Sequence, residues 1–191
     1  MSGLRFFKQF LAYPAEIGSF APSSRALADA VVGMARVHEA RTVVEFGPGS
    51  GAITSSILDN LAADATFFAM EINAGFVALM RERFPNVTVY HDSAANTRRY
   101  LEQAGVSYCD SIVSGLPWAL LNEKLQDELL DTILDVLRPG GMFSAYMYCH
   151  SPVAPAGRRF VSKLKARFSQ VQDSTVVWKN FPPAIVRGAM K

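Results

Sequence analysis

The chain has 191 residues, of which half are hydrophobic and 19% are charged, and its formal net charge is +2. This length is typical of one domain with a substantial core, and so slight a net charge gives no argument of its own for binding nucleic acid. No apolar run approaches the roughly 20 residues that span a bilayer, and Arg5 and Lys8 interrupt the first apolar stretch. We therefore expect neither a transmembrane helix nor a signal peptide.

Helical and extended hydrophobic patterns alternate along the chain, which predicts an α/β fold with a mostly parallel sheet. Ser23 or Ser24 can cap the first long helix, and Asn73 and Asn122 can cap two later ones. The last two strands are close in sequence, which fits an antiparallel hairpin at the sheet edge. The expected helices cover about 24–38, 51–62, 73–84, 94–103, 122–136 and 158–168, and the expected strands about 42–47, 66–71, 87–90, 109–114, 142–149, 170–178 and 183–190.

A glycine-rich turn follows the first expected strand. Its glycines permit backbone angles that other residues avoid and leave room for a ligand to contact the main chain. The second strand ends in Glu71, twenty residues past Gly51, where a carboxylate can accept hydrogen bonds from the two hydroxyls of a ribose. These features together predict a cofactor that contains a nucleoside. The residues of the turn are Gly47, Pro48, Gly49, Ser50 and Gly51.

The spacing of this turn distinguishes two classes of cofactor. Dinucleotide-binding folds use G-x-G-x-x-G and place the pyrophosphate at a helix N-terminus, whereas here G-P-G-S-G is one residue tighter and follows Glu45. A carboxylate at that point would repel a pyrophosphate but can accept hydrogen bonds from a cationic amino-acid moiety. The pattern resembles motif I of the class I S-adenosylmethionine-dependent methyltransferases. That resemblance implies their Rossmann-like three-layer fold, with a seven-stranded, mostly parallel sheet and a C-terminal antiparallel hairpin.

The same resemblance implies how S-adenosylmethionine would be held. Glu45 would hold its amino-acid end, Glu71 its ribose, and Asp92 with Ser93 its adenine, and S-adenosylhomocysteine would be the product. The backbone of the glycine-rich turn would follow the path of the cofactor. The other residues assigned to this site are Ser24, Ile72, Ala94, Ser114 and Leu116.

The acceptor side of the site is expected after the fourth strand, where the chain reads Ser114-Gly115-Leu116-Pro117-Trp118. This stretch resembles the N-L-P-Y motif of ribosomal-RNA adenine dimethylases. In those enzymes the asparagine carbonyl holds the adenine amino group, and here that position is Gly115, so a flipped base would lose its hydrogen-bond anchor. The resemblance therefore disfavours RNA as the substrate.

The complete set of motifs instead resembles the bacterial phospholipid N-methyltransferases, from about residue 5 to the C-terminus. This family methylates phosphatidylethanolamine toward phosphatidylcholine. An RNA or small-amine methyltransferase and a catalytically silent cofactor-binding module remain as alternatives. The matching stretches are Ala21–Ser24, Glu45–Gly51, Ser114–Trp118 and Asn180–Ala184.

Residues 1–20 are expected to form an amphipathic segment at a membrane interface or over the site, and residues 21–191 the methyltransferase domain. Apolar side chains with adjacent cations can lie at an anionic membrane surface, although a helix packed on the core explains the pattern equally well. We expect a monomer or weak oligomer, bound peripherally to the cytoplasmic, inner face of the membrane. The residues expected to contact the membrane are Arg5, Phe6, Phe7, Lys8, Phe10 and Leu11.

Aromatic residues near the ends of strands four and five predict the acceptor pocket. Aromatic faces attract methylated ammonium groups, and Gly115 would leave space for added methyl groups. Tyr146 and Tyr148 alternate along one strand and so share a face, where core packing is the other interpretation. The predicted acceptor residues are Gly115, Trp118, Tyr146, Tyr148 and Tyr13.

Neither histidines nor cysteines form a recognisable metal motif. His38, His91 and His150 are scattered along the chain, and no metal-ligand spacing occurs. Cys109 and Cys149 lie in expected strands, which predicts two buried free thiols. We therefore expect no metal.

Overall fold

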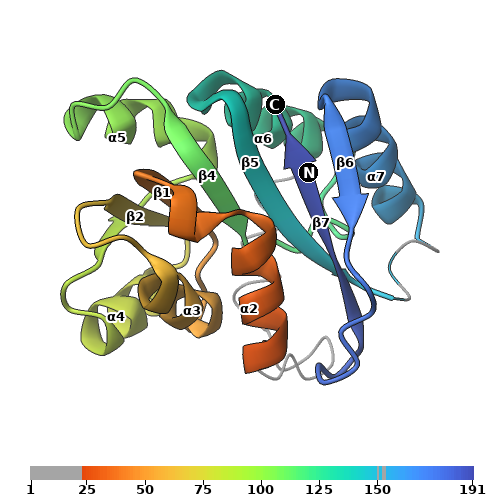
Figure 1. Cartoon of the computed structure of the whole chain (residues 1–191), viewed down its shortest axis with the longest axis horizontal. Helices are drawn as coiled ribbons and strands as arrows, with labels where there is room; N and C mark the ends of the chain where they lie inside the picture. The colour runs from red at the N-terminus through yellow and green to blue at the C-terminus, as the bar shows by residue number, and fades with distance from the viewer. Residues whose placement is uncertain (1–22, 150, 152–153) are drawn as a thin grey trace.

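The computed structural model describes residues 23–149, 151 and 154–191. Its centre is a seven-stranded sheet in the order β3-β2-β1-β4-β5-β7-β6 (Figure 1). The first five strands run parallel, and β7 lies antiparallel to both β5 and β6. The strands are β1 (Thr42–Phe46), β2 (Thr66–Glu71), β3 (Thr88–His91), β4 (Cys109–Ser114), β5 (Leu137–Tyr148), β6 (Gln170–Asp173) and β7 (Ala184–Met190).

Helices cover both faces of this sheet and make three layers (Figure 1). Side chains of α2, α3 and α4 pack on one face, and side chains of α5, α6 and α7 pack on the other. The expected methyltransferase-type sheet, with its antiparallel hairpin, is confirmed. The helices are α2 (Arg25–Met34), α3 (Ala52–Asn60), α4 (Ala74–Arg83), α5 (Thr97–Gln103), α6 (Glu123–Val136) and α7 (Pro155–Arg167), with short 3-10 turns at Val37–Glu39 and Ala94–Asn96.

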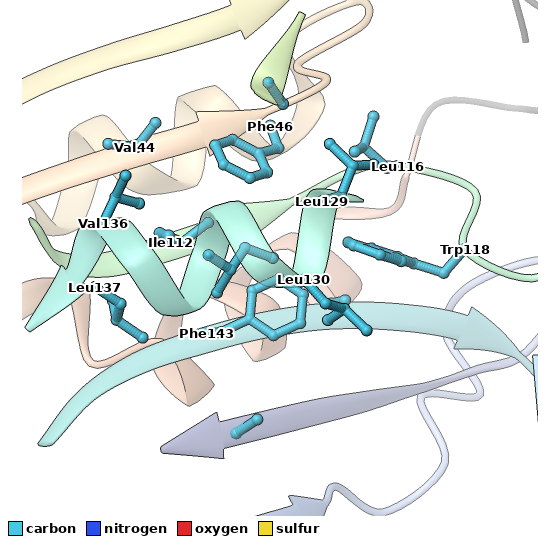
Figure 2. Close-up of a cluster of buried hydrophobic side chains, with 14 of the residues drawn as sticks. Val44, Phe46, Ile112, Leu116, Trp118, Leu129, Leu130, Val136, Leu137 and Phe143 are labelled. Carbon is cyan, nitrogen blue, oxygen red and sulfur yellow. The ribbon is translucent and has the colours of Figure 1, made fainter. Parts of the chain in front are cut away.

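The alternation of side chains along β1 builds both halves of the core. Val43 faces the cluster of α2 and α3, whereas Val44 and Phe46 face the cluster of α6. Figure 2 shows this second cluster, in which Phe46 and Phe143 lie with the apolar side chains of α6. Every residue of β1 is buried, Glu45 included. The strand therefore delivers a carboxylate to the interior, directly before the glycine-rich turn.

Three elements differ by four or five residues at one end from the sequence-based expectation. The first helix ends at Met34 instead of residue 38, because Arg36 takes a left-handed conformation with φ of 52°. Strand β5 begins at Leu137, five residues early, since Leu137 pairs with Cys109 at the start of β4. Strand β6 ends at Asp173 instead of residue 178, and beyond it only a single bridge joins Val177 to Ala184.

The two cysteines have different environments. Cys109 is buried in β4, and burial raises the pKa of its thiol to about 12. Cys149 is exposed, because β5 ends one residue before it. The expectation of a buried thiol at Cys149 is therefore wrong.

None of the helices in the described part of the chain combines the length and the hydropathy that a membrane span requires. The expected amphipathic segment, with Arg5, Phe6, Phe7, Lys8, Phe10 and Leu11, lies outside the described residues, as does Tyr13. The division into segments 1–20 and 21–191 stays a prediction.

Candidate functional site

A pocket opens at the carboxyl ends of β1, β2 and β4, the edge where open α/β sheets bind ligands. Of the residues predicted to bind the cofactor, six line it, from four separate stretches of chain. Met70, Leu125 and Leu129 were missed; Met70 directly precedes Glu71, and the two leucines belong to the apolar face of α6. The lining residues are Gly47, Met70, Glu71, Ile72, Ser93, Ala94, Leu116, Leu125 and Leu129.

The glycine-rich turn requires glycine at several positions. Gly47 and Gly49 have φ values of 68° and 55°, in the left-handed region that side chains disfavour. A Cβ on Gly47 would also lie 2.6 Å from Cδ2 of Leu116, whereas a Cβ on Gly49 would meet no atom of the described part of the chain within 4 Å. The backbone at Gly49 is thus open, as a cradle for a ligand requires. The N–H of Gly49 donates to Oε2 of Glu71 at 3.2 Å, which ties the turn to the end of β2.

Glu71 is a buried carboxylate at the wall of the pocket. Its Oε1 accepts a hydrogen bond from the N–H of Asn73 at 2.8 Å, and 3% of the residue is exposed. Burial raises the pKa of Glu71, although the backbone N–H groups that it binds act in the opposite direction. The structure therefore places an acceptor for hydroxyl groups where the sequence predicted a ribose.

Glu45 is completely buried beside the turn. Its Oε2 accepts a hydrogen bond from Oγ1 of Thr54 at 2.7 Å, and its Oε1 has no partner among the residues that the structure describes. Burial raises the pKa of Glu45 to about 8, and the nearby charge of Glu71 adds to the effect. An unpaired buried carboxyl oxygen is costly unless a donor or a cation reaches it. The ammonium group of S-adenosylmethionine is such a donor, so the residues present fit this cofactor.

Asp92 shapes the turn after β3. Its Oδ1 accepts from the N–H of Ser93 at 2.7 Å and from Asn96 at 2.8 Å, and its Oδ2 accepts from the hydroxyl of Tyr100 at 2.8 Å. Partial burial would raise the pKa of Asp92, but the bonds from Asn96, Tyr100 and Ser93 outweigh it and lower the pKa. The carboxylate thus positions Ser93 and Ala94, which line the pocket. Direct contact between Asp92 and adenine stays a prediction.

Gly115 joins two turns in the structure. Its N–H donates to the carbonyl of Phe46 at 2.8 Å, and a Cβ at this position would lie 2.5 Å from the carbonyl oxygen of Gly47. The space that the sequence analysis reserved for a growing substrate is therefore filled by the backbone of the glycine-rich turn. This interpretation of Gly115 is corrected: the glycine allows the turns that follow β1 and β4 to approach each other.

Trp118 belongs to the core. Its ring is fully buried and stacks on Phe160 with centroids 4.5 Å apart, and Figure 2 shows it pointing into the cluster that holds Leu130 and Phe143. Its Nε1 donates to Oγ of Ser114 at 3.0 Å, an oxygen that also accepts from the N–H of Leu116 at 3.3 Å. The prediction that Trp118 lines the acceptor opening is wrong, because its ring is fully buried in the core. Ser114 instead fixes the turn after β4.

Tyr146 and Tyr148 point to the same face of the sheet, as their alternation predicted. Their rings meet edge to face, with centroids 5.8 Å apart, and both pack against the apolar cluster of α2. Burial raises the pKa of Tyr148. The hydroxyl of Ser23 donates to the hydroxyl of Tyr146 at 3.5 Å, so the pair lies beside the start of α2.

Ser24 caps α2, because its Oγ accepts a hydrogen bond from the N–H of Leu27 at 3.2 Å. Its own N–H donates to Oδ1 of Asn180 at 2.9 Å. Asn180, from the loop between β6 and β7, is buried and also donates through Nδ2 to the carbonyl of Pro182 at 2.7 Å. Two motifs from opposite ends of the sequence therefore meet beside the tyrosine pair. Within the described residues, no group of three or more His, Cys, Asp or Glu side chains could hold a metal ion.

Residues 43–141 match the protein family described as a methyltransferase domain. The chain is 31% identical over 182 residues to an ornithine lipid N-methyltransferase from Singulisphaera acidiphila, and the match covers 94% of this chain and 91% of that protein.

Solved structures show the same fold. The O-methyltransferase from Bacillus cereus, in complex with SAH, has a TM-score of 0.70 at 17% identity, covering 100% of this chain and 91% of that one. The O-methyltransferase TomG from Streptomyces achromogenes, in complex with SAM, has a TM-score of 0.67 at 18% identity, with coverage of 100% and 91%.

Proposed function

The chain belongs to the S-adenosylmethionine-dependent N-methyltransferases of bacterial lipids, and from this premise we propose that it methylates the head-group amine of phosphatidylethanolamine. The mono- and dimethylated lipids would be further substrates, toward phosphatidylcholine. The observation that supports a lipid as the substrate is the similarity to a lipid N-methyltransferase along 94% of the chain. The choice of phosphatidylethanolamine is supported by the resemblance of the Ser114–Trp118 and Asn180–Ala184 stretches to the phospholipid enzymes.

In this proposal the ribose and adenine of the cofactor occupy the pocket described above, where Glu71 takes the ribose hydroxyls. The amino-acid end leaves the pocket along the open backbone at Gly49, and the free Oε1 of Glu45, which is not among the residues that line the pocket, takes the ammonium group. The adenine lies against Ile72, Ser93 and Ala94. Bound S-adenosylmethionine supplies an electrophilic methyl group on a positively charged sulfur.

The protein's task at the acceptor is to present a neutral amine in line with that methyl group. An ammonium ion has no lone pair, so its proton must leave first, and exclusion of water lowers the pKa of a buried ammonium. Tyr146 and Tyr148 supply aromatic faces that tolerate the permanent charge of the methylated product. Catalysis is then mainly proximity and alignment.

The proposal also places the enzyme at the cytoplasmic, inner face of the membrane. Residues 1–20 combine phenylalanines with Arg5 and Lys8, a composition that suits an interface with anionic lipids. This segment would bring the head group to the site without extracting the whole lipid.

A second candidate substrate is the amine of ornithine lipid. It is favoured by the name of the relative from Singulisphaera acidiphila. Both candidates present a primary amine at a membrane surface, so the same site and the same chemistry would serve either.

The test is transfer of radiolabelled methyl from S-adenosylmethionine in mixed liposomes, with the lipids resolved by thin-layer chromatography. One set contains phosphatidylethanolamine and its mono- and dimethyl forms, and a parallel set contains ornithine lipid. Label in the first set supports the proposal, and label in the second set alone selects the second candidate. Absence of label from every lipid, with cofactor binding intact by calorimetry, would contradict both and favour a soluble amine or RNA.

A further inference from the structure

The loop 174–183 joins β6 to β7 at the carboxyl edge of the sheet, the edge that holds the pocket. Strands β6 and β5 are both antiparallel to β7, so β6 ends at the same edge as the parallel strands. In Figure 1 the loop lies below the start of β7, near the first turn of α2. The bond between Asn180 and Ser24 joins it to that turn.

The tip of this loop carries the two most exposed large hydrophobic side chains of the described part of the chain. Trp178 is 76% exposed and Phe181 is 86% exposed. Lys179 is exposed between them, and no acidic residue occurs in 174–183. Leu120, 44% exposed, follows β4 and so lies at the same edge. Trp178, Lys179 and Phe181 therefore give the loop an apolar and basic tip at the edge that holds the pocket.

The exposure of the two rings is built into the loop. Asn180, between them in sequence, is buried and bonded on both sides, to Ser24 and to the carbonyl of Pro182. The N–H of Val177 donates to the carbonyl of Ala184 at 2.8 Å, and the N–H of Asn180 donates to the carbonyl of Val177 at 3.3 Å. The backbone on either side of Trp178 is therefore anchored, which leaves both rings in solvent unless a partner covers them.

We propose that Trp178, Lys179 and Phe181 contact the membrane directly, with the two rings in the interfacial region and the lysine at anionic head groups. Tryptophan prefers the membrane interface because its ring is apolar while its N–H can reach water. A cation beside apolar rings, with no acidic neighbour in the loop, complements an anionic bilayer. This contact is separate from any made by residues 1–20.

The contact would orient the enzyme. With the loop tip in the interface, the carboxyl edge of the sheet faces the head groups, and Tyr146 and Tyr148 lie close to the anchored start of α2. Only this catalytic consequence rests on the proposed function. Contact between the loop and a bilayer is measurable without any methyl transfer.

Tryptophan fluorescence tests the proposal, because the chain has two tryptophans and Trp118 is fully buried. The full chain is mixed with vesicles of phosphatidylglycerol and phosphatidylcholine, which carry no methylatable amine. We expect a blue shift of the emission and quenching by lipids that carry a nitroxide near the head group. Trp178→Phe should abolish both signals while keeping binding.

Affinity is tested by vesicle sedimentation. The double variant Trp178→Ala, Phe181→Ala should bind at least about tenfold more weakly, since each ring loses its burial in the interface. The matched control is Leu58→Ala, which removes a side chain that is 39% exposed on α3 and should change nothing. Unchanged circular dichroism and cofactor affinity establish that the double variant is folded.

Four results would overturn the proposal: no vesicle binding, vesicle binding without a change in the emission of Trp178, equal binding of the double variant and the control, or a dimer in solution that the double variant abolishes. The last result would assign the loop to a second copy of the chain. If no lipid is methylated but Trp178 is quenched, the proposed function fails and the membrane contact stands.

Discussion

Ser24 donates its backbone N–H to the side-chain oxygen of Asn180 at 2.9 Å, across 156 positions of sequence. The bond joins the cap of α2 to the loop between β6 and β7. Both residues lie in stretches that resemble the phospholipid N-methyltransferases. The contact gives a physical reason for their joint presence: one buried amide fixes the helix start and the loop together at the carboxyl edge of the sheet.

Asn180→Ala is therefore expected to destabilise the protein. It leaves the N–H of Ser24 and the carbonyl of Pro182 without their partner, which should lower the free energy of unfolding by about 1–3 kcal/mol. Urea denaturation measures this. The matched control is Asn60→Ala, an exposed asparagine that donates to the carbonyl of Ser56 and should cost under about 0.5 kcal/mol. Equal effects of the two variants would show that the hydrogen bonds of Asn180 contribute no more to stability than the bond of an exposed asparagine.

Gly115→Ala tests the contact between the turns of β1 and β4. The new Cβ would lie 2.5 Å from the carbonyl oxygen of Gly47, and two backbones cannot move apart as a flexible side chain can. We expect a loss of about 1–3 kcal/mol in stability and weaker binding of S-adenosylmethionine by calorimetry. Gly33→Ala is the control, because a Cβ on Gly33 meets none of the described residues within 4 Å and alanine favours a helix. Normal cofactor affinity in Gly115→Ala would show that this contact does not shape the site.

The structural features that depend on a local pattern of residues could be predicted from the sequence. The buried strands, the caps at Ser24, Asn73 and Asn122, and the antiparallel hairpin all follow from hydrophobic period and turn residues. The grouping of Gly47 and Glu71 at one pocket also follows, because the carboxyl ends of parallel strands share an edge.

Features set by contacts between distant segments could not be predicted. Trp118 follows β4 at the expected place, but the packing of Phe160 from α7 decides that its ring is core. Gly115 was interpreted as open space because the approach of the Gly47 carbonyl is a relationship in three dimensions. The left-handed Arg36 that ends α2 early has no local signal, since glycine or asparagine is the usual residue there.

Glu45 makes both stability and cofactor affinity depend on pH. Its pKa in the folded protein is about 8, above the ordinary 4.5, so the folded state binds more protons than the unfolded state between these values. The contribution of this group to stability is therefore full below pH 4.5 and is lost as pH rises to about 8, by several kcal/mol in order of magnitude. Urea denaturation at pH 6 and pH 8 measures this loss. The free energy of unfolding should change much less between these two pH values in Glu45→Gln than in the parent protein.

The ammonium group of the cofactor prefers the ionised form of Glu45. Affinity for S-adenosylmethionine should therefore rise between pH 6.5 and pH 8, where this carboxyl deprotonates. Glu45→Gln should bind more weakly, with a flatter dependence on pH, in calorimetry across that range. The same rise in the variant as in the parent would refute the assignment of the ammonium group to Glu45.

Glu71→Ala should weaken cofactor binding strongly. The carboxylate holds the N–H of Gly49 and of Asn73 and lines the pocket, and bonds to a charged group of this kind correspond to about a 10- to 100-fold change in affinity. Calorimetry with S-adenosylhomocysteine measures this, and Glu82→Ala, an exposed carboxylate on α4, is the control. Unchanged affinity in Glu71→Ala would exclude a ribose contact.

Substitutions of Tyr146 can distinguish between binding of the substrate amine by its aromatic ring and simple packing in the core. Its ring lies edge to face with Tyr148 beside the start of α2. If the ring attracts the methylated ammonium, Tyr146→Leu should raise KM for the dimethylated lipid about 3- to 30-fold, as a contact of roughly 0.5–2 kcal/mol implies. The effect on the unmethylated lipid should be smaller, and Tyr146→Phe should restore both. Rates of methyl transfer to each lipid in mixed micelles give the KM of the variant relative to that of the parent. Equal changes in KM for all three lipids would assign the residue to core packing alone.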